Sequence, residues 1–245
     1  MKAVILAAGY ATRMYPLTLN FPKPLLPVGG KSIIDWLTDD ITASGINDIY
    51  VVTNHRFYPE FLVWSEKRKG VFVLDDGTES NETRLGALRD IEYVTESAGI
   101  DDDIFVLAGD NVLDFSFSSF LSYAREKNTS CVMRHFQEDV EKLRRTGVCT
   151  VDGDGRVLSM VEKPQNPPSR WAVPPFYYYK RTDLPLLKRA IEEGISTDAP
   201  GSFVSYLCER STVHAFLMPG HRYDIGTIEG WEKLRDEYRG ITESC

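Results

Sequence analysis

A glycine turn followed by two cationic residues makes the start of this chain a candidate binding site for a polyphosphate. The apolar run Ala3–Ala8 leads into Gly9, and Arg13 and Lys23 follow. Small residues at such a turn let the backbone approach a ligand closely. Exposed backbone amides together with two cations are what a triphosphate requires. The alternative is a plain turn with solvated basic side chains.

Two aspartates far apart in the sequence are candidate metal ligands. Asp110 follows the apolar run Ile104–Ala108, and Asp224 precedes the last expected helix. Ligands of open α/β sheets bind beyond the carboxyl ends of strands, so Asp110 is expected in the same crevice as the Gly9 turn. Two carboxylates completed by phosphate oxygens suit Mg2+, although either aspartate alone could be a turn residue or helix cap. A third acidic segment, Asp101–Asp103, could be the D-x-D of a glycosyltransferase, but it precedes its strand and is expected to be a solvated loop.

Two other phosphate-binding motifs fail on particular residues. A dinucleotide-binding loop requires glycines where Ala11 and Met14 stand, and an acidic residue where the second strand ends in Thr53-Asn54. A Walker A loop would end at Gly30–Ser32, but its first glycine would have to replace Leu25.

The segment from Leu6 to Lys31 resembles the glycine-rich motif of sugar-1-phosphate nucleotidyltransferases, typified by glucose-1-phosphate thymidylyltransferases. It departs from that pattern at Ala11, where the family usually has glycine, and at Met14 and Ser32. Because alanine is the smallest replacement, we expect a slight adjustment of the loop and retention of phosphate binding. Three further segments resemble the same family: Gly109-Asp110-Asn111, Val161-Glu162-Lys163-Pro164 and Tyr223-Asp224-Ile225-Gly226-Thr227.

The resemblance implies a set of site residues with separate roles. Arg13 would brace the departing pyrophosphate, Lys23 would contact the triphosphate and Lys163 the sugar phosphate, and these are the implied catalytic residues. Thr83 or Asn81, near the base-reading segment, could equally be a helix cap. A Glu-Lys pair at the end of a strand is otherwise usually a surface pair. The implied residues are Ala8, Gly9, Thr12, Arg13, Lys23, Gly86 and Asp110 for the nucleotide, Asn111, Gly147, Glu162 and Lys163 for the acceptor, and Asp110 and Asp224 for Mg2+.

We expect the acceptor phosphate to attack the α-phosphorus of a nucleoside triphosphate in line, with release of pyrophosphate. This chemistry depends on positioning and charge neutralisation and needs no general base, so the four histidines are expected to serve elsewhere. One alternative is a cytidylyltransferase for phosphocholine, in which Phe176–Tyr179 would cage the quaternary ammonium. That run is more simply a strand with half of its side chains in the core. Another alternative is a non-catalytic regulatory protein that binds nucleotide sugars. The sequence does not fix the base or the sugar.

The pattern of elements predicts an α/β fold: a Rossmann-like, mostly parallel mixed sheet covered by helices on both faces, with a smaller sugar-binding lobe. We expect a single nucleotidyltransferase domain over residues 1–245, with a nucleotide-binding core (1–135), an acceptor-binding lobe (136–226) and a C-terminal helix (227–245). The expected strands are Ala3–Ala8, Ile49–Thr53, Val71–Leu74, Ile104–Ala108, Val148–Val151, Val157–Val161, Phe176–Tyr179 and Val213–Leu217. The expected helices are Lys31–Ser44, Phe57–Lys69, Thr83–Thr95, Leu184–Glu193, Ser202–Glu209 and Ile228–Tyr238.

Composition narrows the possible partners. The 245 residues include 28 Lys+Arg and 36 Asp+Glu, which gives a net charge of −8. A surface with this excess of negative charge is unfavourable for binding nucleic acid. The four cysteines, Cys245 among them, show no metal or disulfide spacing. No run is long enough to span a membrane, and the apolar start is too short for a signal peptide. We therefore expect a cytoplasmic protein that binds a nucleoside triphosphate and a sugar 1-phosphate, and we leave open whether it forms a homo-oligomer.

Overall fold

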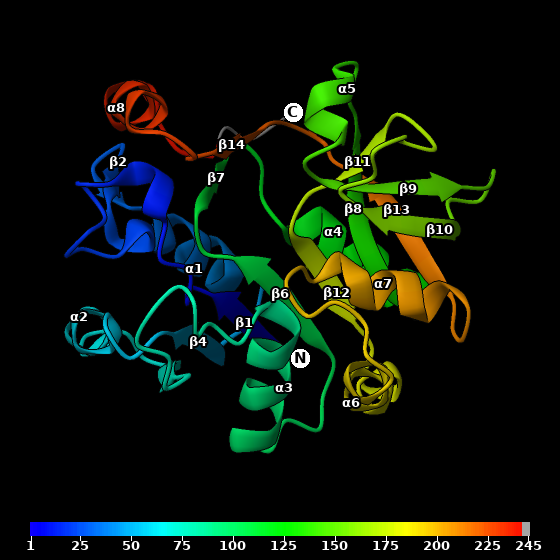
Figure 1. Cartoon of the computed structure of the whole chain (residues 1–245), viewed down its shortest axis with the longest axis horizontal. Coiled ribbons are helices and arrows are strands. Elements are labelled where there is room, and N and C mark those ends of the chain that lie inside the picture. The colour runs from blue at the N-terminus through cyan, green and yellow to red at the C-terminus, as the bar shows by residue number, and fades with distance from the viewer. Residues whose placement is uncertain (242–245) are drawn as a thin grey trace. The chain divides into compact units, whose positions relative to one another are not determined.

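The computed structural model describes residues 1–241, which divide into two compact units (Figure 1). The first, called here unit 1, comprises Met1, Leu85–Leu107 and Ser119–Met218; unit 2 comprises Lys2–Arg84, Ala108–Ser118 and the chain from Pro219. The fold is α/β, with a large mixed sheet flanked by helices. Cys245 and the end of the expected C-terminal segment 227–245 lie outside the described residues, and the predicted division into core and lobe stays a prediction.

Unit 2 is built on three parallel strands in the order β1-β4-β5. Helix α1 packs near the short strand β7, and α2 packs on β5. Two small antiparallel pairs, β2–β3 and β7–β14, complete it. The bounds are β1 Lys2–Leu6, η1 Thr12–Met14, η2 Lys23–Leu25, β2 Pro27–Val28, β3 Lys31–Ser32, α1 Ile33–Ala43, β4 Ile49–Thr53, α2 Tyr58–Ser65, β5 Val71–Asp75, β7 Asn111–Leu113, β14 Arg222–Asp224 and α8 Ile228–Glu237.

Unit 1 carries most of the antiparallel strands, in the order β10-β9-β11-β8-β12-β6, with β13 parallel to β8. Helix α7 packs against β10, and α6 packs against α3 and α7 (Figure 1). The bounds are α3 Ala87–Ser97, β6 Ile104–Ala108, α4 Ser118–Lys127, β8 Ser130–Phe136, α5 Val140–Leu143, β9 Gly147–Val151, β10 Val157–Glu162, β11 Trp171–Val173, β12 Phe176–Tyr179, η3 Arg181–Asp183, α6 Pro185–Glu192, α7 Gly201–Cys208 and β13 Val213–Leu217.

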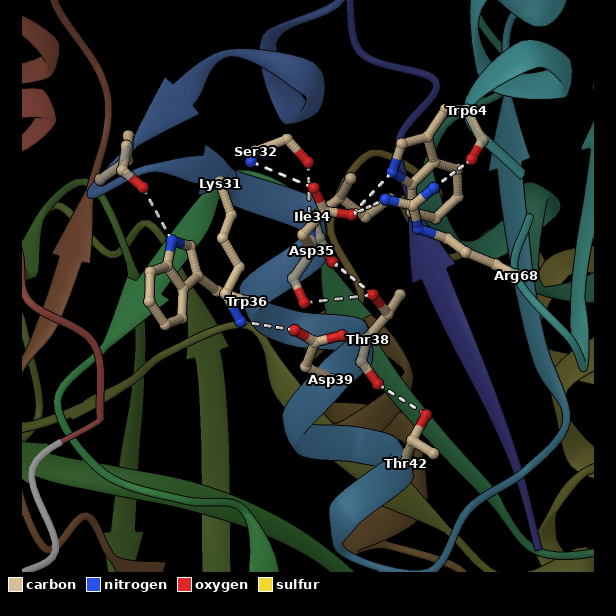
Figure 2. A network of polar contacts seen from close by, with 11 residues as sticks. Lys31, Ser32, Ile34, Asp35, Trp36, Thr38, Asp39, Thr42, Trp64 and Arg68 are labelled. Carbon is tan, nitrogen blue, oxygen red and sulfur yellow. Dashed lines mark hydrogen bonds and ion pairs between the residues drawn. The ribbon is translucent and has the colours of Figure 1, made fainter. Parts of the chain in front are cut away.

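Polar contacts fix the start of α1 and attach it to α2 (Figure 2). The hydroxyl of Ser32 accepts from the backbone N–H of Asp35, whose carboxylate accepts from the N–H of Ser32, so the helix begins with a capping box. The same carboxylate accepts from Trp64 and Arg68, at the end of α2 and just beyond it. Gly45 follows the helix at φ +88°, a conformation that glycine adopts at little cost, and confirms the predicted end.

The apolar core of unit 2 brings the C-terminal helix α8 against the N-terminal loop. Trp231 and Tyr238 pack in one buried cluster with Met14 and Val112. The indole of Trp231 donates to the Pro27 carbonyl at 3.0 Å, and the hydroxyl of Tyr238 donates to the Leu113 carbonyl. Buried aromatic residues of this size contribute a large share of packing energy. The segment just before α8, which contains Asp224, is therefore held beside β7.

Sequence patterns located most elements, but α4 and β8 were not predicted, and four expectations differ from the structure. The helix expected over Thr83–Thr95 begins at Ala87 with Gly86 as its N-cap, so neither Thr83 nor Asn81 caps it. All four side chains of Phe176–Tyr179 are at most 2% exposed, not half of them, because β12 lies between β6 and β8. Asp101–Asp103 does precede its strand, but it is ion-paired, with Arg181 and Lys180 among its partners, and is not simply solvated. Antiparallel pairs also form a larger share of the sheet than the expected mostly parallel order.

Candidate active site

The turn after β1 is shaped by one buried amide and one left-handed residue. Asn54 is fully buried, donates to the Ala8 carbonyl at 2.9 Å and accepts from the Phe57 N–H at 3.0 Å. Ala11 has φ +47° and ψ +41°, the left-handed conformation that favours glycine. The left-handed backbone at Ala11 explains why the family that this sequence resembles usually has glycine at that position. Gly9 is exposed, with no heavy atom within 4 Å of where a Cβ would stand. The backbone there is open to a ligand.

The cations predicted for this turn differ in their surroundings. Arg13 and the neighbouring Thr12 lie on the short turn η1 and are exposed. Lys23 begins η2, between two prolines, and is only 8% exposed. Its ammonium group contacts Asp110 Oδ2 at 2.6 Å and Asp224 Oδ1 at 3.9 Å. Lys23 is therefore a buried cation that bridges the two carboxylates predicted to bind metal.

The two aspartates meet because β7 and β14 are paired. The register places Asp224 opposite Asn111, the residue after Asp110. Gly109 lets the segment before Asp110 pack closely against β1, because a Cβ there would lie 3.1 Å from a side-chain carbon of Ile5 and 3.3 Å from the Leu6 carbonyl. Asp110 and Asp224 lie 114 positions apart in the sequence, yet both contact the ammonium group of Lys23. Their side chains are 36% and 53% exposed.

Asn111 was predicted to bind the acceptor, and its side chain forms hydrogen bonds to other residues of unit 2. It is fully buried, donates to Asp110 Oδ1 at 2.8 Å and accepts from Arg222 at 2.7 Å. These bonds hold the Asp110 carboxylate in one orientation. Its predicted contact with the acceptor stays a prediction. Arg222 is a residue that sequence reasoning missed; it lies two positions before Asp224 on the same short strand.

Unit 1 brings together the predicted acceptor residues Gly147 and Glu162. A Cβ on Gly147 would lie 3.1 Å from Glu162 Oε1, and one on Gly201 would lie 1.9 Å from the same atom. The Glu162 carboxyl group thus rests against two glycine backbones. Burial raises the pKa of Glu162, against the opposing effect of the neighbouring Lys163 ammonium group.

Lys163 follows directly and is held differently. Its backbone is in the left-handed region at φ +46°, and its ammonium group lies 3.4 Å from Asp198 Oδ2. Asp198 was missed, because a single acid in an exposed loop carries no sequence pattern. The preceding residue, Thr197, accepts the Leu88 N–H at 3.0 Å and lies where a Cβ on Gly86 would clash, at 2.7 Å. One loop therefore adjoins both Lys163 and Gly86.

A pocket of about 350 Å³ in unit 1 contains Lys163. Arg144, Gln165 and Asn166 also line it, and none of these three was singled out from the sequence. All of these side chains are polar, and two are cationic. Such a lining suits an anionic ligand rich in hydroxyl groups.

Comparisons with known proteins agree with the resemblance seen in the sequence. A family model described as Nucleotidyl transferase matches residues 2–239. A glucose-1-phosphate adenylyltransferase of Clostridium novyi is 29% identical over 96% of this chain and 66% of its own length. A UTP–glucose-1-phosphate uridylyltransferase of Haloferax volcanii is 27% identical over 99% of this chain and 100% of its own length.

A solved structure supports the fold. A UDP-glucose pyrophosphorylase complexed with UDP-glucose superposes with a TM-score of 0.81 at 19% identity, covering 97% of each chain. The chain spans less than two thirds of the length of some curated relatives, such as 63% of one from Sulfolobus acidocaldarius. No helix of residues 1–241 has the length and apolar character needed to cross a membrane.

Proposed function

Because the chain belongs to the nucleotidyl transferase family, we propose that it transfers a nucleoside monophosphate from a nucleoside triphosphate to a sugar 1-phosphate, giving a nucleoside diphosphate sugar and pyrophosphate. The observation that carries the proposal is the group formed by Lys23, Asp110 and Asp224. A buried cation between two carboxylates suits a site that must hold both a polyphosphate and a metal ion.

Donor binding is assigned to unit 2. The exposed backbone at Gly9 and the cation of Arg13 would hold the triphosphate, with Arg13 offsetting the charge of the departing pyrophosphate. The ammonium group of Lys23 would move from its carboxylate partners to a phosphate oxygen. Ala8 and Thr12 complete the proposed nucleotide contacts in unit 2, and Gly86, which belongs to unit 1, stays proposed as a further nucleotide contact.

The carboxylates fit Mg2+. Asp110 and Asp224 offer hard oxygen donors, and the Lys23 ammonium group already occupies a cation position between them. Residues 1–241 hold no group of three or more His, Cys, Asp or Glu placed to bind a metal. Water and phosphate oxygens must complete the coordination, as is usual for Mg2+. When bound, the ion would neutralise the charge that develops on the phosphoryl oxygens.

Acceptor binding is assigned to unit 1. Glu162, held against Gly147 and Gly201, would accept hydrogen bonds from sugar hydroxyls. Lys163 would bind the acceptor phosphate and leave its exposed pair with Asp198. Because both partners in that pair are about half exposed, the pair is worth little and is readily exchanged for a dianion. Asn111, which belongs to unit 2, stays proposed as a further contact to the acceptor.

The chemistry needs no proton transfer from the chain. The acceptor phosphate is ionised at neutral pH and can attack the α-phosphorus directly, while Arg13 and Lys23 offset negative charge. Three histidines contact residues outside this group: His221 lies beside Asp114, His55 beside Asp75 and His214 beside Thr129. The buried run Phe176–Tyr179 offers no aromatic cage, which weakens the phosphocholine alternative.

The test is a matrix of nucleoside triphosphates against sugar 1-phosphates, with pyrophosphate release as the signal. Because the relatives' names share glucose 1-phosphate and differ in the nucleotide, glucose 1-phosphate is the first acceptor, tested with ATP, UTP, dTTP, CTP and GTP. We expect at least one pair to turn over in Mg2+ and to stop on chelation. Absence of pyrophosphate from every pair, or turnover with phosphocholine alone, would contradict the proposal.

A further inference from the structure

We propose that Arg144 is a second cationic determinant of acceptor binding, acting with Lys163 on the anionic group of the sugar phosphate. This inference rests on the proposed function and deepens it, since it extends the acceptor site to a residue that no resemblance pointed to. It also names the class of ligand that the pocket takes: a phosphate dianion attached to a hydroxyl-bearing group.

Arg144 is held in place at the pocket by two bonds. Its Nε–H donates to the Gln165 carbonyl at 2.9 Å, and its Nη1 contacts Glu141 Oε1 at 2.5 Å. Gln165 is only two residues after Lys163, so the first bond attaches the guanidinium group to the segment that carries the lysine. A planar guanidinium held in one orientation presents its remaining N–H groups as a fork, the arrangement that phosphate recognition favours.

Glu141 and Asp198, the carboxylates paired with Arg144 and Lys163, form only weak ion pairs with these cations. Arg144 and Glu141 are 45% and 64% exposed, and Lys163 and Asp198 are 56% and 47% exposed. Pairs this exposed contribute little, because water screens them. A phosphate dianion that contacts both cations at once has a stronger attraction than either exposed carboxylate. Arg144 is thus attached to the segment that carries Lys163 through its bond to Gln165, and both cations line the same pocket and remain available to a ligand.

The rest of the pocket favours the same ligand class. Its volume of about 350 Å³ falls within the range of small-molecule sites. The carboxamides of Gln165 and Asn166 supply both donors and acceptors for phosphate oxygens and sugar hydroxyls. No apolar side chain belongs to the lining that residues 1–241 provide.

The neighbouring Arg145 gives a matched control. It carries the same charge, is exposed and follows Arg144 directly, but it is not among the pocket's lining residues in the described chain. Steady-state kinetics would compare the full-length wild type with Arg144→Ala, Arg144→Lys and Arg145→Ala, using the best substrate pair. We expect Arg144→Ala to raise the acceptor KM about tenfold, equivalent to about 1.4 kcal/mol. The KM for the triphosphate should change less than twofold.

The controls separate binding from general effects of charge or folding. Arg144→Lys should restore part of the loss, and Arg145→Ala should leave both KM values within twofold of wild type. An unchanged acceptor KM in Arg144→Ala would overturn the inference. So would an equal rise in Arg145→Ala, or a loss in kcat alone.

A binding measurement separates this inference from the proposed function. Titration with inorganic phosphate, followed by 31P NMR, requires no turnover. We expect Arg144→Ala to bind phosphate several-fold more weakly than wild type and Arg145→Ala. If no substrate pair releases pyrophosphate, the proposed function fails, and this titration still decides the role of Arg144. Equal phosphate binding by wild type and Arg144→Ala would overturn that role.

Discussion

Replacing Lys23 with methionine should have opposite effects on metal affinity and on turnover. In the structure the ammonium group occupies the space between Asp110 and Asp224, so a metal ion must displace it before it can use both carboxylates. Methionine retains the long apolar stem of this 8% exposed side chain without the charge. We expect Lys23→Met to bind Mg2+ more tightly than wild type and to lose turnover about a hundredfold or more, because a contact to the triphosphate is lost.

The size of the gain in affinity follows from the geometry. Asp110 and Asp224 are 36% and 53% exposed, so their attraction to Lys23 must be discounted for screening by water. We assign about 1 kcal/mol to the contact with Asp110 and about 0.4 kcal/mol to the longer one with Asp224. The total, about 1.4 kcal/mol, corresponds to a roughly tenfold lower Kd for Mg2+.

Isothermal titration calorimetry with Mg2+, without nucleotide, measures this change. Lys31→Met is the matched control, because Lys31 is exposed and its partner is Asp39. The control should leave the Mg2+ Kd within twofold of wild type. An unchanged or raised Kd in Lys23→Met would show that the lysine and the metal do not compete for these carboxylates, and would refute the reasoning.

Three further substitutions test the backbone and the buried acid. Ala11→Gly should raise stability by about 0.5–1 kcal/mol in urea unfolding, because φ +47° strains any side chain; equal or lower stability would contradict this. Gly86→Ala should lower the melting temperature more than Gly99→Ala. Both glycines have a positive φ, but only a Cβ at Gly86 would meet the backbone oxygen of Thr197, at 2.7 Å. Equal losses in the two variants would contradict a role for this close contact. The raised pKa of Glu162 means that the folded state binds its proton more tightly, so the stability that this group contributes is lost as pH rises from 4.5 through the folded-state pKa. Glu162→Gln should flatten this part of a urea-derived stability profile, and an unaltered slope would argue against the shift.

The sequence predicted elements well where one strong local pattern decides them. Ile49–Thr53 and Ile104–Ala108 are uninterrupted strand-like runs, and both match the observed strands at each end. The start of α3 was missed because Thr83 and Asn81 look like caps, whereas Gly86 takes that position with a positive φ. The burial of Phe176–Tyr179 depends on having strands on both sides, which no local pattern contains.

The site shows the same division between local and long-range information. Gly9, Arg13 and Lys23 were identified because they lie in one segment with a recognisable spacing. The β7–β14 pairing that brings Asp224 to Asp110 involves strands of three residues each, too short to predict from periodicity. Asp198 and Arg144 are ordinary charged residues in the sequence, and only their positions beside Lys163 and Gln165 distinguish them.

The rate of pyrophosphate release by Asp224→Asn tests the central claim most directly. This substitution removes one carboxylate from the shared group while keeping the size of the side chain. Asp236→Asn, at an exposed aspartate paired with Arg235, is the control. We predict that Asp224→Asn loses about a hundredfold or more in kcat, with an unchanged melting temperature, and that the control retains wild-type activity. Near-normal pyrophosphate release by Asp224→Asn would contradict the account.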